Sequence, residues 1–127
     1  MKVVICGIIL RDELVFVAKR SSKMSVPSKW EFPGGKKNEH ESEEDCLRRE
    51  LKEELNISIR IKQRFTSNIH HYNDISINLI AYIVIYTGGQ IHLKEHEDAR
   101  WFKKEELLDL NWAPADIPIL HKFLNYK

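Results

Sequence analysis

The sequence feature that most constrains the fold is a segment from Ser42 to Leu55 in which leucines recur every fourth residue. Leu47, Leu51 and Leu55 stand at positions i, i+4 and i+8, the spacing that places side chains on one face of an α-helix. Ser42 precedes an acidic first turn and suits the N-cap, and Asn56 tolerates the left-handed conformation that ends many helices. The segment therefore predicts a helix with one apolar face that must pack against another layer of structure.

Strand-like segments flank this helix in the sequence. Residues 2–10 and 14–19 are rich in Val, Ile and Phe and are separated by a polar turn, which predicts a hairpin. Residues 57–65 and 76–86 also predict strands, and the second, as the most hydrophobic stretch, is expected inside a sheet. A short strand, a helical turn and a final helix are predicted at residues 100–102, 104–108 and 116–123. A chain of 127 residues in this pattern predicts one α/β domain over residues 1–127.

Composition excludes several classes of function. Lys+Arg 20 against Asp+Glu 19 leaves no excess of positive charge for coating a nucleic-acid polymer or binding a membrane surface. Cys6 and Cys46 are too few for a disulfide framework, so we expect reduced and buried thiols. The apolar run near the N-terminus is too short to span a membrane and lacks a small-residue cleavage site, so a cytoplasmic location is expected.

Acidic residues concentrate on the predicted helix. Glu50, Glu53 and Glu54 are spaced i, i+3 and i+4, so their carboxylates project from one side of it. One interpretation is a solvated acidic face that neighbouring basic residues balance. The other is a site for a hard divalent cation, which prefers oxygen ligands and commonly bridges carboxylates to phosphates. The pair Gly34-Gly35 just before the helix suits a loop that packs closely against such a site.

The spacing of these residues resembles the Nudix box, GX5EX7REUXEEXGU, in which U is aliphatic. From Gly35 the chain has Glu41 after five residues and, after seven more, the run Arg49-Glu50-Leu51-Lys52-Glu53-Glu54-Leu55-Asn56-Ile57. Asn56 replaces the family's glycine, and asparagine is the next-best residue for the left-handed turn. The preceding run Trp-Glu-Phe-Pro-Gly-Gly-Lys is similar to the MutT-type branch of Nudix hydrolases.

The resemblance implies an α/β/α sandwich with a mixed β-sheet and a loop-helix-loop catalytic motif. It also implies Mg²⁺ as the cofactor, for which Mn²⁺ can substitute. A distal carboxylate often completes the metal site in this family, and Glu95, six residues before Trp101, fits that position, with Glu97 as the competing choice. The metal ligands implied are Glu50, Glu53, Glu54 and Glu95.

The reaction implied is attack of water on a phosphorus of a nucleoside triphosphate, which releases a nucleoside monophosphate and pyrophosphate. Glu53 or Glu54 is the implied general base, and Arg49 would orient a glutamate, with Glu41 as its partner. Arg20 matches a position that contacts phosphates in MutT-type enzymes, although a surface charge at a strand end explains it as well.

Asp116 is the residue on which the choice of base depends. It lies in an Ala-Pro-Ala-Asp-Ile-Pro run that resembles CTP and 5-methyl-dCTP pyrophosphohydrolases, whereas 8-oxo-dGTP enzymes have asparagine there. An ionised aspartate is only an acceptor and could bind cytosine or guanine, and Asp116 could instead cap the last helix. Tyr72 could stack on the base. The full set of expected substrate-binding residues is Val4, Arg20, Phe32, Gly34, Gly35, Lys36, Tyr72 and Asp116.

Three functions remain open at this point. The first is removal of CTP, modified dCTP or 8-oxo-dGTP from the nucleotide pool, by a monomer or a homodimer. The second is hydrolysis of ADP-ribose or a dinucleoside polyphosphate. The third is a non-catalytic nucleotide-binding module, although such modules usually lose the metal glutamates. A zinc site is not expected, because the six histidines lack the HExxH arrangement.

Overall fold

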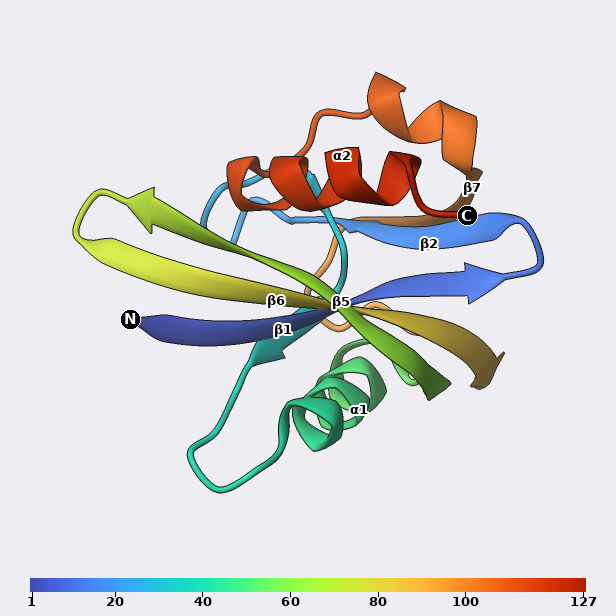
Figure 1. Ribbon diagram of the computed structural model, residues 1–127, viewed down its shortest axis with the longest axis horizontal. Coiled ribbons are helices and arrows are strands. Elements are labelled where there is room, and N and C mark those ends of the chain that lie inside the picture. The colour runs from blue at the N-terminus through green and yellow to red at the C-terminus, as the bar shows by residue number, and fades with distance from the viewer.

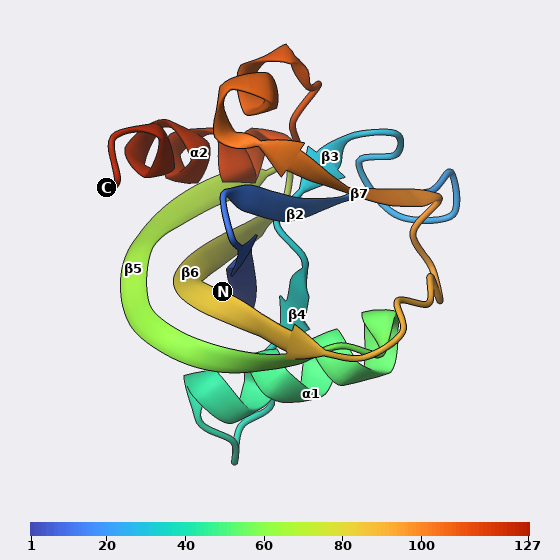
Figure 2. The same cartoon turned by 90° about the vertical axis from the view of Figure 1, so that its right-hand side faces the viewer.

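The computed structural model describes residues 1–127 as a mixed β-sheet held between two helices, with α1 on one side of the sheet and α2 on the other (Figures 1 and 2). This arrangement confirms the predicted α/β/α sandwich. None of the helices is both long enough and apolar enough to cross a membrane. The strands are β1 (Lys2–Arg11), β2 (Leu14–Lys19), β3 (Trp30–Glu31), β4 (Gly34–Lys36), β5 (Ser58–Tyr72), β6 (Ile75–Gly88) and β7 (Asp98–Lys103), and the helices are α1 (Glu43–Leu55) and α2 (Ile117–Leu124), with 3₁₀ turns at Lys104–Asp109 and Pro114–Asp116.

The sheet has the strand order β3-β2-β1-β6-β5, with β4 paired to β1 and β7 paired to β2. Strands β1 and β6 run parallel, and the other pairs are antiparallel. The predicted hairpin of β1 and β2 is therefore confirmed, as is the interior position of β6 between β1 and β5. A parallel pair between two strands with apolar residues on both faces is expected where helices cover both sides of a sheet.

Side chains along the central strands point alternately to the two faces of the sheet and so divide the core into two layers. In β1, Ile5 and Ile9 join the cluster under α1, whereas Cys6 and Ile8 join the cluster under α2. Strand β6 divides its buried residues in the same way, because successive side chains of a strand point to opposite faces. Cys6 and Cys46 are free and buried, which confirms the expected thiols.

Helix α1 begins and ends where the sequence predicts. The Ser42 side chain accepts a hydrogen bond from the Asp45 backbone N–H at 3.0 Å, and Asn56 has φ 58° and ψ 38° in the left-handed region. The predicted leucine face is completely buried, and burial of each leucine stabilises the fold by about 1.5–3 kcal/mol. The apolar face therefore holds α1 against the sheet, and Glu50, on the flank beside the leucines, comes to lie against Gly35 of β4.

The predictions missed some boundaries. Strand β5 continues to Tyr72 instead of ending near Phe65, and it pairs with β6 along this whole length with three register shifts. Strands β3 and β4 were not predicted, since two or three residues are too few to show an alternating pattern. The last helix begins at Ile117 after a 3₁₀ turn, one residue later than expected.

Candidate active site

Two glycines of β4 bring the sheet and helix α1 into direct contact. Gly34 pairs with Cys6 and Gly35 pairs with Ile5 of β1. A Cβ atom at Gly34 would overlap the Ile5 carbonyl oxygen, and one at Gly35 would overlap the Glu50 carboxylate. Only glycine leaves room for these approaches, so the predicted tight packing of this loop against the helix is confirmed.

A hollow of about 260 Å³ opens beside this contact, and Glu50, Glu54 and Glu95 all line it. One oxygen of Glu54, Oε2, is buried and has no hydrogen-bond partner. Burial, and then the negative charges of Glu95 and Glu50, raise the pKa of Glu54. Glu54 thus combines an unpaired buried oxygen with two neighbouring negative charges, and a hard divalent cation would supply the positive charge that balances them.

Glu53 lies outside this group. Its side chain is 51% exposed, and its Oε2 accepts from Arg49 Nη1 at 3.3 Å. Position i+3 lies on the opposite flank of the helix from position i+4, so Glu53 and Glu54 diverge on either side of Glu50. Three of the four expected metal ligands thus line one hollow, whereas Glu53 does not, and no three acidic side chains are drawn together closely enough here to share one cation. Glu97, the alternative to Glu95, instead forms an ion pair with Lys19 at 3.6 Å.

Arg49 forms the expected pair with Glu41. Its Nε and Nη2 atoms donate to the two Glu41 carboxylate oxygens at 2.9 and 2.6 Å, and its Nη1 donates to Glu50 at 2.7 Å. The Arg49 hydrogen bonds, together with the Asn38 backbone N–H, lower the pKa of Glu41 to about 2. Arg49 therefore holds Glu41 and Glu50 in one hydrogen-bond network, of which Glu50 is the member that lines the hollow.

A second network contains two residues that the sequence did not single out, Glu31 and His96. Arg20 Nη1 donates to Glu31 Oε1 at 2.6 Å, and His96 Nε2 lies 2.7 Å from Glu31 Oε2. Arg20 also donates from Nε to the Ser25 carbonyl oxygen at 2.6 Å. Arg20 is thus part of an internal network and not only a surface charge. Pairing of Ala18 in β2 with Glu31 in β3 brings Glu31 beside Arg20, so a predicted β2–β3 pair would have revealed that contact. His96 arrives by another route, in the segment that leads into β7, which also pairs with β2.

Next to this network lies a more apolar hollow of about 450 Å³, where the expected base-binding residues Val4, Tyr72 and Asp116 all line the wall. Asp116 is buried, and its Oδ2 accepts from the Phe32 backbone N–H at 2.9 Å. Asp116 occupies the N-cap position of α2, as one interpretation predicted, but its side chain makes no capping hydrogen bond to the helix. Burial, and then the charge of Glu31, raise the pKa of Asp116 well above its usual range. The Tyr72 hydroxyl accepts from the Ala115 backbone N–H at 3.3 Å.

The two hollows share one wall. Arg20, Glu31 and Asp116, together with Val4 and Leu79, line both of them. Phe32 lies in the carboxylate-lined hollow and packs on Trp112 with ring centroids 4.7 Å apart. An elongated ligand could therefore place an apolar ring in one hollow and an anionic chain in the other.

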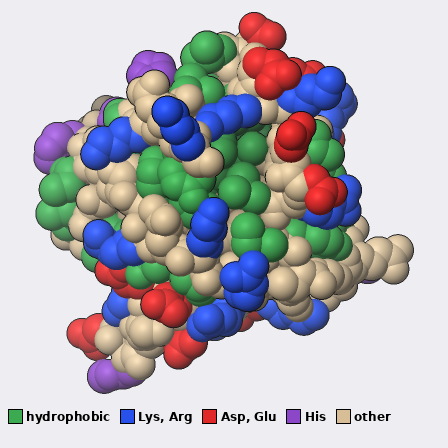
Figure 3. Space-filling view, turned by 45° about the vertical axis from the view of Figure 1, so that its right-hand side comes forward, with side chains coloured by type: hydrophobic (Ala, Val, Ile, Leu, Met, Phe, Trp, Pro, Cys, Tyr) green, Lys and Arg blue, Asp and Glu red, His purple; other side chains and the backbone are tan.

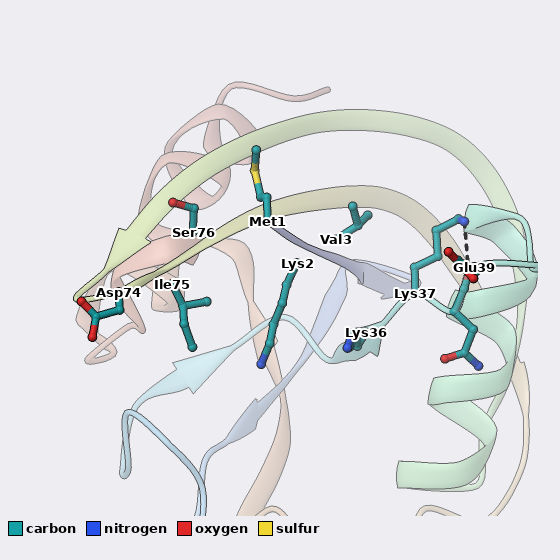
Figure 4. A pocket seen from close by; sticks show the side chains of 10 residues that line it. Met1, Lys2, Val3, Lys36, Lys37, Glu39, Asp74, Ile75 and Ser76 are labelled. Carbon is teal, nitrogen blue, oxygen red and sulfur yellow. Dashed lines mark hydrogen bonds between the residues drawn. The ribbon is translucent and has the colours of Figure 1, made fainter.

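Lys36 connects the site with a separate, open hollow of about 550 Å³ (Figure 4). Lys2 and Lys37 also line this hollow, and Lys37 Nζ donates to the Asn38 carbonyl oxygen at 3.2 Å. None of the glutamates of α1 reaches it. On the face drawn in Figure 3, basic and acidic side chains both surround a central apolar area, in keeping with the near-neutral net charge.

Comparison with known proteins identifies the class to which this fold and site belong. A NUDIX domain model matches residues 1–123, so the chain belongs to the Nudix family. It is an enzyme of the hydrolase class that acts on phosphoric anhydride bonds, and it groups with the MutT-type members.

Named relatives agree with this assignment. The chain is 36% identical to the CTP pyrophosphohydrolase of Escherichia coli over 95% of its own length and 90% of the relative. It is 34% identical to a putative 8-oxo-dGTP diphosphatase 2 of Mycobacterium tuberculosis over 91% of the chain and 82% of the relative. The solution structure of the Escherichia coli ORF135 protein superimposes with a TM-score of 0.86 at 35% identity, covering 98% of this chain and 89% of that one.

Proposed function

We propose that the protein is a magnesium-dependent pyrophosphohydrolase that converts nucleoside triphosphates to monophosphates and pyrophosphate and thereby cleans the cytoplasmic nucleotide pool. CTP and modified dCTP form the favoured substrate class, and 8-oxo-dGTP is the second candidate. One observation carries the proposal: a carboxylate-lined hollow and a more apolar hollow share a wall at Glu31 and Asp116. A nucleotide has the same division into an apolar ring and an anionic chain. The names of the relatives support both candidate substrates.

In this proposal Glu50, Glu54 and Glu95 hold the cation, with Glu53 completing the set from the rim. Mn²⁺ can replace Mg²⁺, since both prefer oxygen ligands. The bound cation would neutralise phosphate charge and lower the pKa of the attacking water. Arg49 fixes the orientation of Glu50 through the 2.7 Å hydrogen bond. Glu53 or Glu54 accepts the proton of the water as its oxygen attacks the β phosphorus, and the bond from that phosphorus to the α–β bridging oxygen breaks.

The phosphate chain would lie beside Gly34, Gly35 and Lys36, all of which line the carboxylate-lined hollow. Lys36 offers an exposed ammonium to the phosphates. Arg20 is already hydrogen bonded to Glu31, so its remaining N–H groups are the ones available for a phosphate oxygen.

Asp116 supports cytosine for an electrostatic reason. Its raised pKa favours the neutral acid, which can both donate and accept a hydrogen bond. The cytosine edge offers an amine donor beside a ring-nitrogen acceptor, which matches a neutral acid. The guanine edge offers two adjacent donors, which match an ionised carboxylate better. Val4, Phe32 and Tyr72 would enclose the ring.

Pyrophosphate release from a panel of triphosphates tests the proposal. CTP, 5-methyl-dCTP, dCTP, dGTP and 8-oxo-dGTP would be compared with ADP-ribose in the presence of Mg²⁺. We expect turnover of the cytidine compounds. Of the two variants Glu54→Gln and Glu53→Gln, the one that removes the general base should lose about 10²–10⁴-fold in kcat. Failure to hydrolyse any triphosphate would refute the activity, and full activity in both variants would refute the assigned carboxylates.

Separate variants test the base pocket. Asp116→Asn keeps the shape of the side chain and a hydrogen-bond acceptor for the Phe32 N–H, but it cannot change protonation. An amide offers a donor and an acceptor as the neutral acid does, so we expect Asp116→Asn to retain the preference for cytidine substrates, whereas Asp116→Ala should lose it with phosphate chemistry retained. An unchanged preference in Asp116→Ala would show that Asp116 does not recognise the base.

A further inference from the structure

The segment between β6 and β7 carries Glu95 without any regular secondary structure of its own. Backbone hydrogen bonds tie it to its surroundings: Lys94 N–H donates to the Glu54 carbonyl oxygen at 3.2 Å, and Glu97 N–H donates to the Lys19 carbonyl oxygen at 3.0 Å. These bonds hold the chain on either side of Glu95.

His96 is the one buried residue in this segment. Its side chain is only 3% exposed, and its Nε2 is 2.7 Å from Glu31 Oε2. Its Nδ1 is buried without any hydrogen-bond partner, so the imidazole is held inside by one polar contact and by packing. The partner is itself fixed, because Arg20 holds the other Glu31 oxygen at 2.6 Å.

We infer that His96 is a positioning residue that holds Glu95 beside Glu50 and Glu54 by attaching the segment to Glu31. The inference rests on the proposed function, in which these three carboxylates bind the cation. Adjacent residues share a peptide unit, so an imidazole fixed in the interior limits the positions of the neighbouring carboxylate. Partners that orient metal ligands in this way typically change metal affinity by about 10–100-fold when they are removed.

The contact between His96 and Glu31 also links the two hollows. Glu31 lines both the more apolar hollow and the carboxylate-lined hollow, whereas His96 lines only the carboxylate-lined hollow. Attachment to Glu31 therefore sets the position of a metal ligand relative to the wall against which a nucleotide would rest. A role in general stability alone would not require this particular partner.

Mn²⁺ binding in the absence of nucleotide, followed by electron paramagnetic resonance, tests the inference. His96→Asn and His96→Gln form a matched pair, because the Gln amide nitrogen reaches the place of Nε2, whereas the Asn amide nitrogen stops near Nδ1. We expect His96→Asn to weaken Mn²⁺ binding about 10–100-fold and His96→Gln to retain most of it. His92→Asn is the control, because His92 lies in the same segment and is exposed.

A double-mutant cycle with Glu95→Gln separates positioning from a structural effect. If His96 acts through Glu95, His96→Asn adds little to the loss of binding already caused by Glu95→Gln. The single His96→Asn variant should also require more Mg²⁺ for half-maximal turnover, with KM for the nucleotide nearly unchanged. Additive losses, or equal binding by the Asn and Gln variants, would overturn the inference and leave the proposed function intact. A wild-type protein that binds no Mn²⁺ would overturn both.

Discussion

Replacing the two glycines of β4 one at a time should separate the stability of the sheet from the chemistry of the site. A Cβ at Gly34 would overlap the Ile5 carbonyl oxygen and come within 2.6 Å of Cys6 Cα. At Gly35 the overlapping group is the Glu50 carboxylate, which is the end of a flexible side chain. The same added methyl group thus meets rigid backbone in one case and a proposed metal ligand in the other.

The magnitudes follow from these neighbours. Gly34→Ala must push β4 away from β1, and overpacking of this kind costs about 1–3 kcal/mol. With an unfolding entropy of about 2.1 cal/mol/K per residue, a chain of 127 residues loses about 4 °C in Tm per kcal/mol, so we expect a decrease of about 4–11 °C. Gly35→Ala should cost less than about 1 kcal/mol but displace Glu50, with a loss of metal affinity of about 10-fold or more.

Thermal unfolding by circular dichroism and Mn²⁺ binding, measured on both variants, would check these values. The expected pattern is a low Tm with nearly normal binding in Gly34→Ala, when it is assayed well below its Tm. Gly35→Ala should show the reverse. A Gly35→Ala protein that binds Mn²⁺ normally, or whose Tm falls as far as that of Gly34→Ala, would refute the reasoning from these contacts.

Three further predictions concern the surroundings of the site. Asn56→Ala should destabilise by about 1–2 kcal/mol in urea unfolding, because alanine is strained at φ 58° and the 3.0 Å bond to the Gln90 carbonyl is lost, whereas Asn56→Gly should be nearly neutral. The Arg49 pair depresses the pKa of Glu41 to about 2, so its contribution to stability is complete above pH 4.5 and is lost as the pH falls toward 2; Glu41→Gln should therefore flatten the acid side of the stability curve. Burial raises the pKa of Cys46 to about 12, so the native thiols should resist alkylation at neutral pH, and fast modification would contradict their burial.

Local sequence predicted α1 well, because its leucines, its Ser42 cap and its left-handed Asn56 all act within a few residues of one another. The length of β5 was not predictable in this way. After Phe65 the polar residues Thr66, Ser67 and Asn68 remove the strand-like composition. They are nevertheless in a strand because β6 pairs with them across the sheet, and tertiary pairing overrides a weak local preference.

In the candidate site, too, contacts between residues close in the sequence could be predicted, whereas contacts that depend on tertiary pairing could not. The resemblance to the Nudix box implied the pair of Arg49 with Glu41, and the glycine pair predicted close packing of its loop against the helix, since these residues lie in or next to one helix. Glu31 and His96 were missed because they are 65 residues apart in the sequence and meet only in the folded chain. Helical spacing also could not show that Glu53 turns toward Arg49, away from the hollow.

Strand β5 forms one edge of the sheet, and its outer N–H and C=O groups could in principle accept a further strand. Its three register shifts interrupt a regular ladder, and Arg60 and Lys62 stand exposed along it. A second copy laid edge to edge would have to match this irregular backbone and bring like charges together. The longest strand of the enzyme is therefore poorly suited to fibril growth, and the chain should stay dispersed at concentrations at which a flat, apolar edge would aggregate.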